Sequence, residues 1–325
     1  MASPNLSEII TTTLRNRSGE CADNVSKGNA LLNRLKQKGA WKAVTGRTIV
    51  RELDYAEGRF QWYSGYDILD VSPADVITAA EYNWAQAAGI VSASGLEIDV
   101  QNAGKEAVID LFEARIKNAQ RTMKNQITYG MYSNGSAYSG KIIGGLQLIV
   151  ADSPATGIVG GINRATAGNE FWRNQYYRST ADGGASLSDS TIQSHLDQLT
   201  MRCTRGTDHP DLYLADRVCY GYFWKSLQAI QRITKDSDGN AGAGFKALDF
   251  AGNPFVYEDN TGIPSEHVYA LNTDYMEFCY APKRNFTPLP EDRAFNQDAF
   301  IQLILWAGQL VTNNASLQGV LYDNA

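Results

Sequence analysis

The stretch AVIDLFEARIKNAQRTMKNQI, residues 107–127, gives the strongest structural signal in the chain. Its apolar residues recur every three or four positions, which is the period of one face of an α-helix. Charged residues fall between them, so the opposite face is suited to water. The pattern predicts a helix over about 104–131, roughly 40 Å long at about 1.5 Å per residue. The apolar stripe comprises Val108, Phe112, Ile116, Ala119, Met123, Ile127 and Met131.

The segments on either side of this helix lack the helical pattern. MYSNGSAYSGKIIGGL (131–146) follows it and is rich in Gly, Ser and Asn, which end a helix. VITAAEYNWAQAAGIVSASGLEI (76–98) precedes it and predicts a strand that stops at Ser94-Gly95. The side chains expected on one side of this strand are Tyr82, Trp84, Ala88 and Ile90.

A long hairpin is expected further upstream. TIVRELDY (48–55) combines β-branched residues with near-alternation of apolar and charged positions. The chain turns near Gly58, and FQWYSGYDIL (60–69) is expected to return as the second strand. Both faces mix polar and apolar residues, so neither is an obvious core face.

The hairpin carries an unusual density of aromatic side chains in YAEGRFQWYSGY (55–66). Five of these twelve residues are aromatic, although glycine and charged residues mark the segment as turn-rich and wet. Such aromatics need a surface that buries them, either in the same chain or in another molecule. The residues concerned are Tyr55, Phe60, Trp62, Tyr63 and Tyr66, with Glu57 and Arg59 between them.

The rest of the chain alternates helical and strand patterns. Residues 188–206 predict a helix with Ser188 as its N-cap and Ile192, Leu196, Leu199 and Cys203 on its apolar face. DLYLAD (211–216) predicts a short strand, and further strand pairs follow between 245 and 282. The segment 298–321 predicts a long strand and a return.

Charge is distributed unevenly along the 325 residues. The net charge is −6, but residues 1–47 carry eight Lys and Arg against three Asp and Glu. This +5 arm precedes a body of −11. Such an arm contacts nucleic acid or an acidic protein surface, or is simply a solvated tail.

No catalytic, metal or cofactor signature is recognisable, and no cofactor is expected. The glycine-rich segments 157–164 and 239–245 lack the spacing of nucleotide-binding loops, and 236–247 lacks the glycine and glutamate of a calcium loop. His195 is expected to be a surface or capping residue. Cys21, Cys203, Cys219 and Cys279 are scattered, as expected of free thiols in a reducing compartment. No apolar run approaches the length of a membrane span, and no signal peptide is visible.

The order of these elements resembles the Hong Kong 97-type major capsid proteins of tailed bacteriophages. AAGIVSASGLEI (87–98) and the helix after it are similar to that family's strand and spine helix. MYSNGSAYSGKIIGGL is similar to the turn after the spine, and AGNPFVY (251–257) to a hairpin of the axial domain. FIQLILWAGQLVTNNASLQGVL (300–321) is similar to the closing strands.

The resemblance implies an α+β fold with an N-terminal arm (1–44), an extended loop (45–78) and a peripheral domain (79–150) containing the spine helix. An α/β axial domain (151–290) follows, and closing strands (291–325) return to the peripheral domain. It implies a structural role and no enzymatic one: self-assembly, through hexamers and pentamers, into the icosahedral shell of a virion. The loop residues Tyr55, Glu57, Arg59, Phe60, Trp62, Tyr63 and Tyr66 would then contact a neighbouring subunit.

Further partners follow from the same resemblance. The interior-facing basic residues would contact packaged double-stranded DNA non-specifically or an acidic surface. They are Arg15, Arg17, Lys36, Lys38 and Lys42. Portal, scaffolding and decoration proteins are the other expected partners, no membrane is involved, and the protein would be made in the host cytoplasm. Scaffolding would come from a separate protein, or a short piece of the arm would be cleaved.

Two alternatives remain open. The first is the shell protein of a bacterial nanocompartment with the same fold. The second is a monomeric α/β enzyme whose site is not visible in the sequence. One departure from the namesake family is already evident: no lysine occurs between Lys42 and Lys105, so the extended loop lacks the nucleophile of a covalent crosslink.

Overall fold

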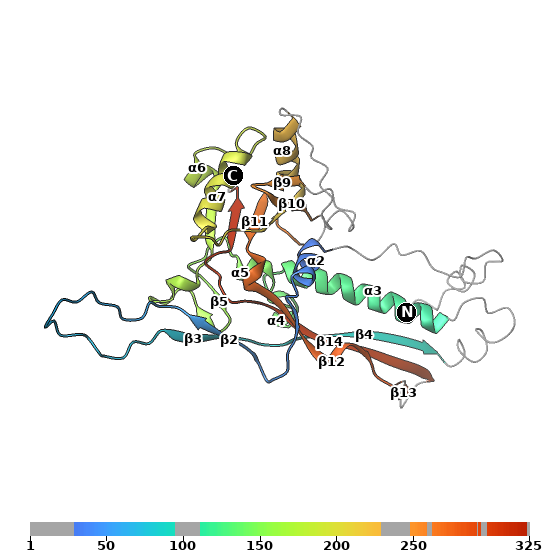
Figure 1. The fold of residues 1–325 in the computed structure, drawn as a ribbon. Helices are drawn as coiled ribbons and strands as arrows, with labels where there is room; N and C mark the ends of the chain where they lie inside the picture. The colour runs from blue at the N-terminus through green and yellow to red at the C-terminus, as the bar shows by residue number, and fades with distance from the viewer. Residues whose placement is uncertain are drawn as a thin grey trace.

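The computed structural model describes residues 29–94, 111–228, 248–258, 262–290, 292–293 and 298–323. Two sheets, with helices packed on them, carry most of the chain (Figure 1). Arg15, Arg17, Cys21, Lys105 and the first turns of the expected long helix lie outside the described residues. No helix in the described part of the chain is long and apolar enough to cross a membrane.

The first sheet has five strands and lies beside the long helix. Its order is β1 (Trp41–Ala43), β12 (Met276–Pro288), β14 (Ala299–Thr312) and β13 (Asp292–Arg293), and β4 (Ala85–Ser94) pairs with β14. Helix α3 (Leu111–Tyr132) packs against β4 (Figure 1). Met123, Ile127 and Met131 are buried, which confirms the apolar stripe over the described part of α3.

The second sheet has six strands, and its three central strands are buried on both faces. Its order is β7 (Gln175–Arg178), β15 (Gly319–Tyr322), β11 (His267–Leu271), β8 (Leu212–Ala215), β10 (Asn253–Tyr257) and β9 (Leu248–Phe250). Tyr213 and Ala215 of β8 join the core under α7 (Ile192–Cys203) and α8 (Arg217–Gln228), whereas Leu212 and Leu214 join the core shared with the first sheet. Burial on both faces explains why this strand reads as a continuous apolar run.

Helix α7 matches its predicted stripe, because Ile192, Leu196, Leu199 and Cys203 are all buried. The predicted cap is wrong. Thr191 is the N-cap residue, and Ser188 contributes its backbone oxygen, which accepts from the N–H of Ile192.

Shorter elements connect the sheets. Helix α2 (Ala30–Gln37) begins at Asn29, whose side-chain oxygen accepts from the N–H of Leu32. The others are α4 (Ala137–Gly140), α5 (Leu146–Ile149), α6 (Ser179–Gly183), the hairpins β2 (Ile49–Asp54) with β3 (Ile77–Tyr82) and β5 (Ile158–Val159) with β6 (Ile162–Asn163), and 3-10 turns at Glu170–Trp172 and Thr273–Tyr275.

The strand predicted over 76–98 is in fact two strands. β3 ends at Tyr82 and β4 begins at Ala85, and the two strands belong to different sheets, so the strand is interrupted at Asn83–Trp84. The interruption shifts the alternation, and Ile90 is 69% exposed although it was expected beside the buried Tyr82. The buried positions of β4 are Ala85, Gly89, Val91 and Ala93.

The closing strands also divide differently from the expectation. β14 joins the first sheet, but β15 inserts between β7 and β11 of the second, so the expected return to the peripheral domain is wrong for β15. The chain therefore crosses between the sheets twice at one place, from β11 to β12 and from β14 to β15. Gln318 and Asn272 tie the two crossings together through a reciprocal pair of hydrogen bonds of 2.9 and 3.0 Å.

Candidate intersubunit contact surfaces

The base of the extended hairpin packs against its own chain. β2 and β3 pair antiparallel from Ile49–Tyr82 to Asp54–Ile77. The return strand is therefore 77–82 and not 60–69 as predicted. Ile49, Leu53, Ala80 and Tyr82 form a buried face, so the expectation that neither face joins a core is wrong at the base.

The loop beyond this base, residues 56–76, contains no strand and projects away from the body (Figure 1). Phe60 and Trp62 are 76% and 88% exposed, and they contact each other edge to face at 5.1 Å. Tyr63 and Tyr66 are also exposed. The loop thus displays large apolar side chains that make little contact with their own body.

Three other predicted loop residues have different surroundings. Tyr55 packs on Phe171 at 5.2 Å, so it belongs to the base of the hairpin. Arg59 pairs with Asp70 across the loop, and Glu57 is exposed. The prediction also omitted Ile68 and Val71, which are 92% and 91% exposed. Both lie beyond Tyr66, outside the aromatic-rich stretch 55–66 on which the expected contact set rests.

The row of exposed apolar residues in the loop comprises Phe60, Trp62, Tyr63, Tyr66, Ile68 and Val71. Soluble single-chain proteins rarely expose so contiguous a set, whereas protein–protein contact surfaces commonly do. This row is the principal candidate contact surface of the chain.

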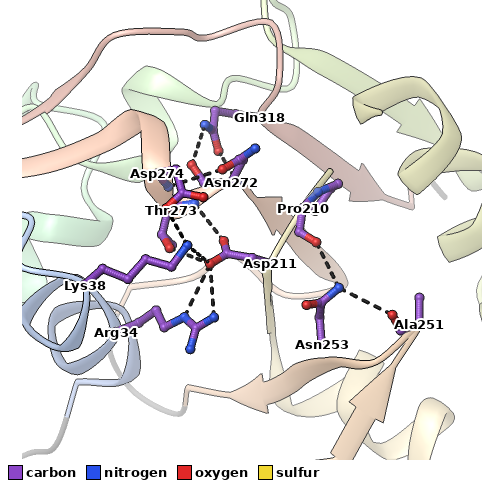
Figure 2. Close-up of polar contacts among 10 residues, drawn as sticks. All are labelled: Arg34, Lys38, Pro210, Asp211, Ala251, Asn253, Asn272, Thr273, Asp274 and Gln318. Carbon is purple, nitrogen blue, oxygen red and sulfur yellow. Dashed lines mark hydrogen bonds and ion pairs between the residues drawn. The ribbon is translucent and has the colours of Figure 1, made fainter. Parts of the chain in front are cut away.

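Helix α2 is fixed to the body by a network of ion pairs around Asp211 (Figure 2). Lys38 Nζ lies 2.6 Å and Arg34 Nη2 lies 3.2 Å from Asp211 Oδ2. The backbone N–H and hydroxyl of Thr273 donate to the same carboxylate at 2.7 Å each. Burial acts to raise the pKa of Asp211, but the bonds from Lys38 and Thr273 outweigh it and hold the pKa below its usual value.

A second acidic anchor, Glu277 of β12, joins the arm to the hairpin base. Its carboxylate lies 2.6 Å from Lys42 Nζ and 2.6 Å from Arg51 Nη2. Burial acts to raise the pKa of Glu277, but the bonds from Lys42 and Arg51 outweigh it and lower the pKa. One carboxylate thus links β1, β2 and β12.

The described basic residues of the expected interior set therefore contact this chain itself. Lys38 and Lys42 pair with Asp211 and Glu277, and Lys36 lies 4.9 Å above the ring of Trp41. Their surroundings are those of an arm held on its own body by opposite charge.

Glu258 closes the other end of α2. The buried carboxylate accepts a hydrogen bond from the N–H of Ala30, at the N-terminus of the helix. Tyr132, the last residue of α3, hydrogen-bonds the same carboxylate. Burial raises the pKa of Glu258 to about 7, and the two bonds offset that only in part.

Groups that could perform chemistry do not assemble into a site in the described part of the chain. No three His, Cys, Asp or Glu side chains there could hold a metal ion. His195 is buried against Tyr177, with ring centroids 5.5 Å apart, so its expected surface position is wrong. Cys203, Cys219 and Cys279 are free and buried, and burial raises the pKa of the Cys203 thiol to about 12.

Comparison with solved structures identifies similar chains over almost the full length. A chain of the cyanophage A-1(L) capsid asymmetric unit matches with a TM-score of 0.70 at 16% identity, over 95% of this chain and 97% of that chain. The capsid of an empty GTA particle matches at 0.64 and 13% identity, over 96% of each chain. The holo-SrpI encapsulin complex from Synechococcus elongatus PCC 7942 matches at 0.54 and 11% identity, over 99% of this chain and 96% of that chain.

No protein-family model matches the sequence, and neither does any curated protein. The likeness therefore lies in the fold and not in the sequence. In this chain the fold comprises the projecting hairpin, the long helix beside a five-stranded sheet, and the six-stranded sheet with its helices. The chain has the Hong Kong 97-type capsid fold, as its resemblance to that family predicts.

Proposed function

We propose that this chain is the major capsid protein of a tailed bacteriophage and assembles with copies of itself into the icosahedral shell of the virion. The observation that carries the proposal is the row of exposed apolar residues on a projecting loop, in a chain that matches capsid chains over 95% or more of both lengths. A second copy of the chain is the partner that would bury this row in every subunit of a closed shell. The role is structural, and no catalytic step is part of it.

The size of the purified protein tests this proposal directly. A shell elutes as a particle of megadalton mass and appears as closed rings or polygons in negative-stain images. A species near 35.7 kDa over a wide range of protein and salt concentrations contradicts the proposal and favours the monomeric alternative.

Within the shell, we assign the row to a contact between neighbouring subunits of hexamers and pentamers. Tyr55 is left out of this contact, because it packs on Phe171 of its own chain. Glu57 and Arg59 lie at its edge, where exposed charge sets specificity more than affinity.

Packaged double-stranded DNA is the proposed content of the particle, held without sequence specificity. The ion pairs of Lys38 and Lys42 with Asp211 and Glu277 argue against these two lysines as its main contacts. Portal, scaffolding and decoration proteins are proposed partners on the basis of the fold alone.

The encapsulin likeness supports one second candidate, a nanocompartment shell. The contents of purified particles separate the two. Nuclease-protected double-stranded DNA supports the capsid, whereas a co-purifying protein in stoichiometric amounts and no DNA supports the compartment.

A further inference from the structure

The base of the extended hairpin rests on the turn between β5 and β6. The backbone N–H of Glu81 in β3 donates to the oxygen of Gly160 at 2.9 Å. Gly160 has φ +57°, and a Cβ at this position would lie 2.8 Å from the Cβ of Ala80 and 3.0 Å from the ring of Tyr82. Both neighbours are buried. The approach is so close that a residue with a side chain would push against the strand itself.

The β5–β6 turn is itself fixed to the body. Trp172 is buried and donates from its ring nitrogen to the oxygen of Val159 at 3.0 Å. Arg164, which follows β6, is fully buried and donates to the backbone oxygens of Leu148 and Ile149 at the end of α5. The turn therefore presents a rigid surface to the hairpin.

The hairpin base also makes other contacts with the body. β2 and β3 pair with each other and with no further strand in the described part of the chain. An isolated two-stranded sheet is marginal in water, so contacts at its base must set its direction. Besides Gly160, these contacts include the bond from Tyr82 Oη to the oxygen of Thr312 at 3.1 Å, the packing of Tyr55 on Phe171, and the Arg51–Glu277 pair. The buried face of the hairpin base also packs in the main hydrophobic core.

We infer that the Gly160–Gly161 turn is a positioning element for assembly: it sets the angle at which the hairpin leaves the body. The inference rests on the proposed shell function for its consequence, but the positioning itself is a property of the single chain. Because the row of exposed apolar residues lies far out on the loop (Figure 1), a small rotation at Ala80 becomes a large displacement at the contact surface. Glycine at 160 keeps the surface in register with its partner.

Gly160→Ala tests the inference, and Gly161→Ala is its matched control. Both glycines have positive φ, +57° and +74°, so both variants carry the strain of a left-handed residue. Only the first creates a clash, because a Cβ on Gly161 would lie no closer than 3.8 Å to the rest of the molecule, where it would meet the oxygen of Glu81. We expect Gly160→Ala to lower the yield of closed particles about tenfold or more, through overpacking against a fixed strand. Gly161→Ala should assemble at close to the parent yield.

A compensating substitution separates the clash from a general folding defect. Ala80→Gly removes the methyl group that a Cβ at 160 would meet at 2.8 Å and leaves the ring of Tyr82 at 3.0 Å, so adding it to Gly160→Ala should restore part of the particle yield. Full assembly of Gly160→Ala, equal loss in Gly161→Ala, or failure of Ala80→Gly to restore assembly would each overturn the inference.

The direction of the hairpin is also measurable without a shell. Spin labels at Tyr66→Cys on the loop and Met201→Cys on α7, both exposed positions, report the loop-to-body distance in unassembled chains carrying Cys21→Ser. Gly160→Ala should shift this distance and Gly161→Ala should not. An unshifted distance in Gly160→Ala overturns the positioning role. If the parent chain never assembles but Gly160→Ala still shifts the distance, only the proposed shell function is contradicted.

Discussion

The ammonium group of Lys38, the C-cap residue of α2, lies between two carboxylates, 2.6 Å from Asp211 and 2.7 Å from Asp274. The two pairs differ in their exposure to water. The Asp211 side chain is 12% exposed and that of Asp274 is 67% exposed. Lys38 therefore forms one sheltered ion pair and one solvated ion pair, whose contributions to stability can be compared directly.

Asp211→Asn is therefore expected to destabilise the chain by about 2 kcal/mol, because it removes the acceptor charge from Lys38, Arg34 and Thr273 together. Asp274→Asn should change the free energy of unfolding by less than about 0.5 kcal/mol, as is usual for exposed ion pairs. Urea unfolding of the unassembled chain at neutral pH measures both. Equal losses in the two variants would mean that the Asp211 network does not hold α2 to the body.

Glu258 predicts an unusual pH dependence. Its pKa in the folded chain is raised to about 7, so the folded state binds a proton more tightly than the unfolded one. The resulting stabilisation is complete below the ordinary glutamate pKa and is lost as the pH rises through about 7. Between pH 8 and pH 5 this group should add up to about 3 kcal/mol to the free energy of unfolding.

Glu258→Gln should remove that contribution, because the amide stays neutral throughout while its oxygen still accepts from Ala30. Denaturant titrations of parent and variant across this pH range measure how the free energy of unfolding of each protein depends on pH. The comparison also cancels the contribution of His267, which is the same in both proteins. Burial acts to lower the pKa of His267, but its hydrogen bond to Asp152 outweighs burial and raises the pKa. Parallel curves for the two proteins would show that Glu258 is charged in the folded state at neutral pH.

The loop aromatics are expected to matter for assembly and not for folding. Phe60→Ala with Trp62→Ala removes two exposed rings, so the melting temperature of the unassembled chain should stay unchanged. Particle yield should collapse, because each aromatic buried at a contact centre contributes about 2 kcal/mol or more and the contact recurs throughout the shell. Tyr55→Ala is the reverse control: it should lower the melting temperature through its lost packing on Phe171. Normal particles from the double variant would remove the row from the contact.

Shells of this protein are expected to lack covalent crosslinks. An isopeptide bond from the extended loop needs a lysine amine, and residues 43–104 contain Arg47, Arg51 and Arg59 but no lysine. Arginine stays protonated near neutral pH and cannot replace it. Particles boiled in detergent and reductant should therefore give a single band near 35.7 kDa, or slightly below it after trimming. A ladder of higher bands that survives this treatment would contradict the prediction.

Elements could be predicted well where their contacts lie close in sequence, or where their apolar residues keep a single period along the whole element. The stripe of α3 and the four apolar positions of α7 follow the helical period, and both are buried as expected. β8 was recognisable as a short apolar run between turn residues. In each case local periodicity and burial agree.

The failures have a common physical origin in tertiary contacts. Nothing local indicates that Asn83–Trp84 breaks a strand, or that the return strand of the hairpin begins only at Ile77. The buried face of the hairpin base exists because residues distant in sequence pack on it, among them Gly160 against Ala80. Likewise, Lys38 and Lys42 look like free arm charges until the fold brings Asp211 and Glu277 beside them.

The paired crossings between the two sheets have a mechanical consequence. Because β11 continues into β12 and β14 continues into β15 at the same place, a pull that separates the sheets loads two covalent segments in parallel. The hydrogen bonds between Gln318 and Asn272 hold the two segments side by side, so both segments share the load. A force that pulls the two sheets apart is therefore carried by two backbone segments and not by hydrogen bonds between strands alone.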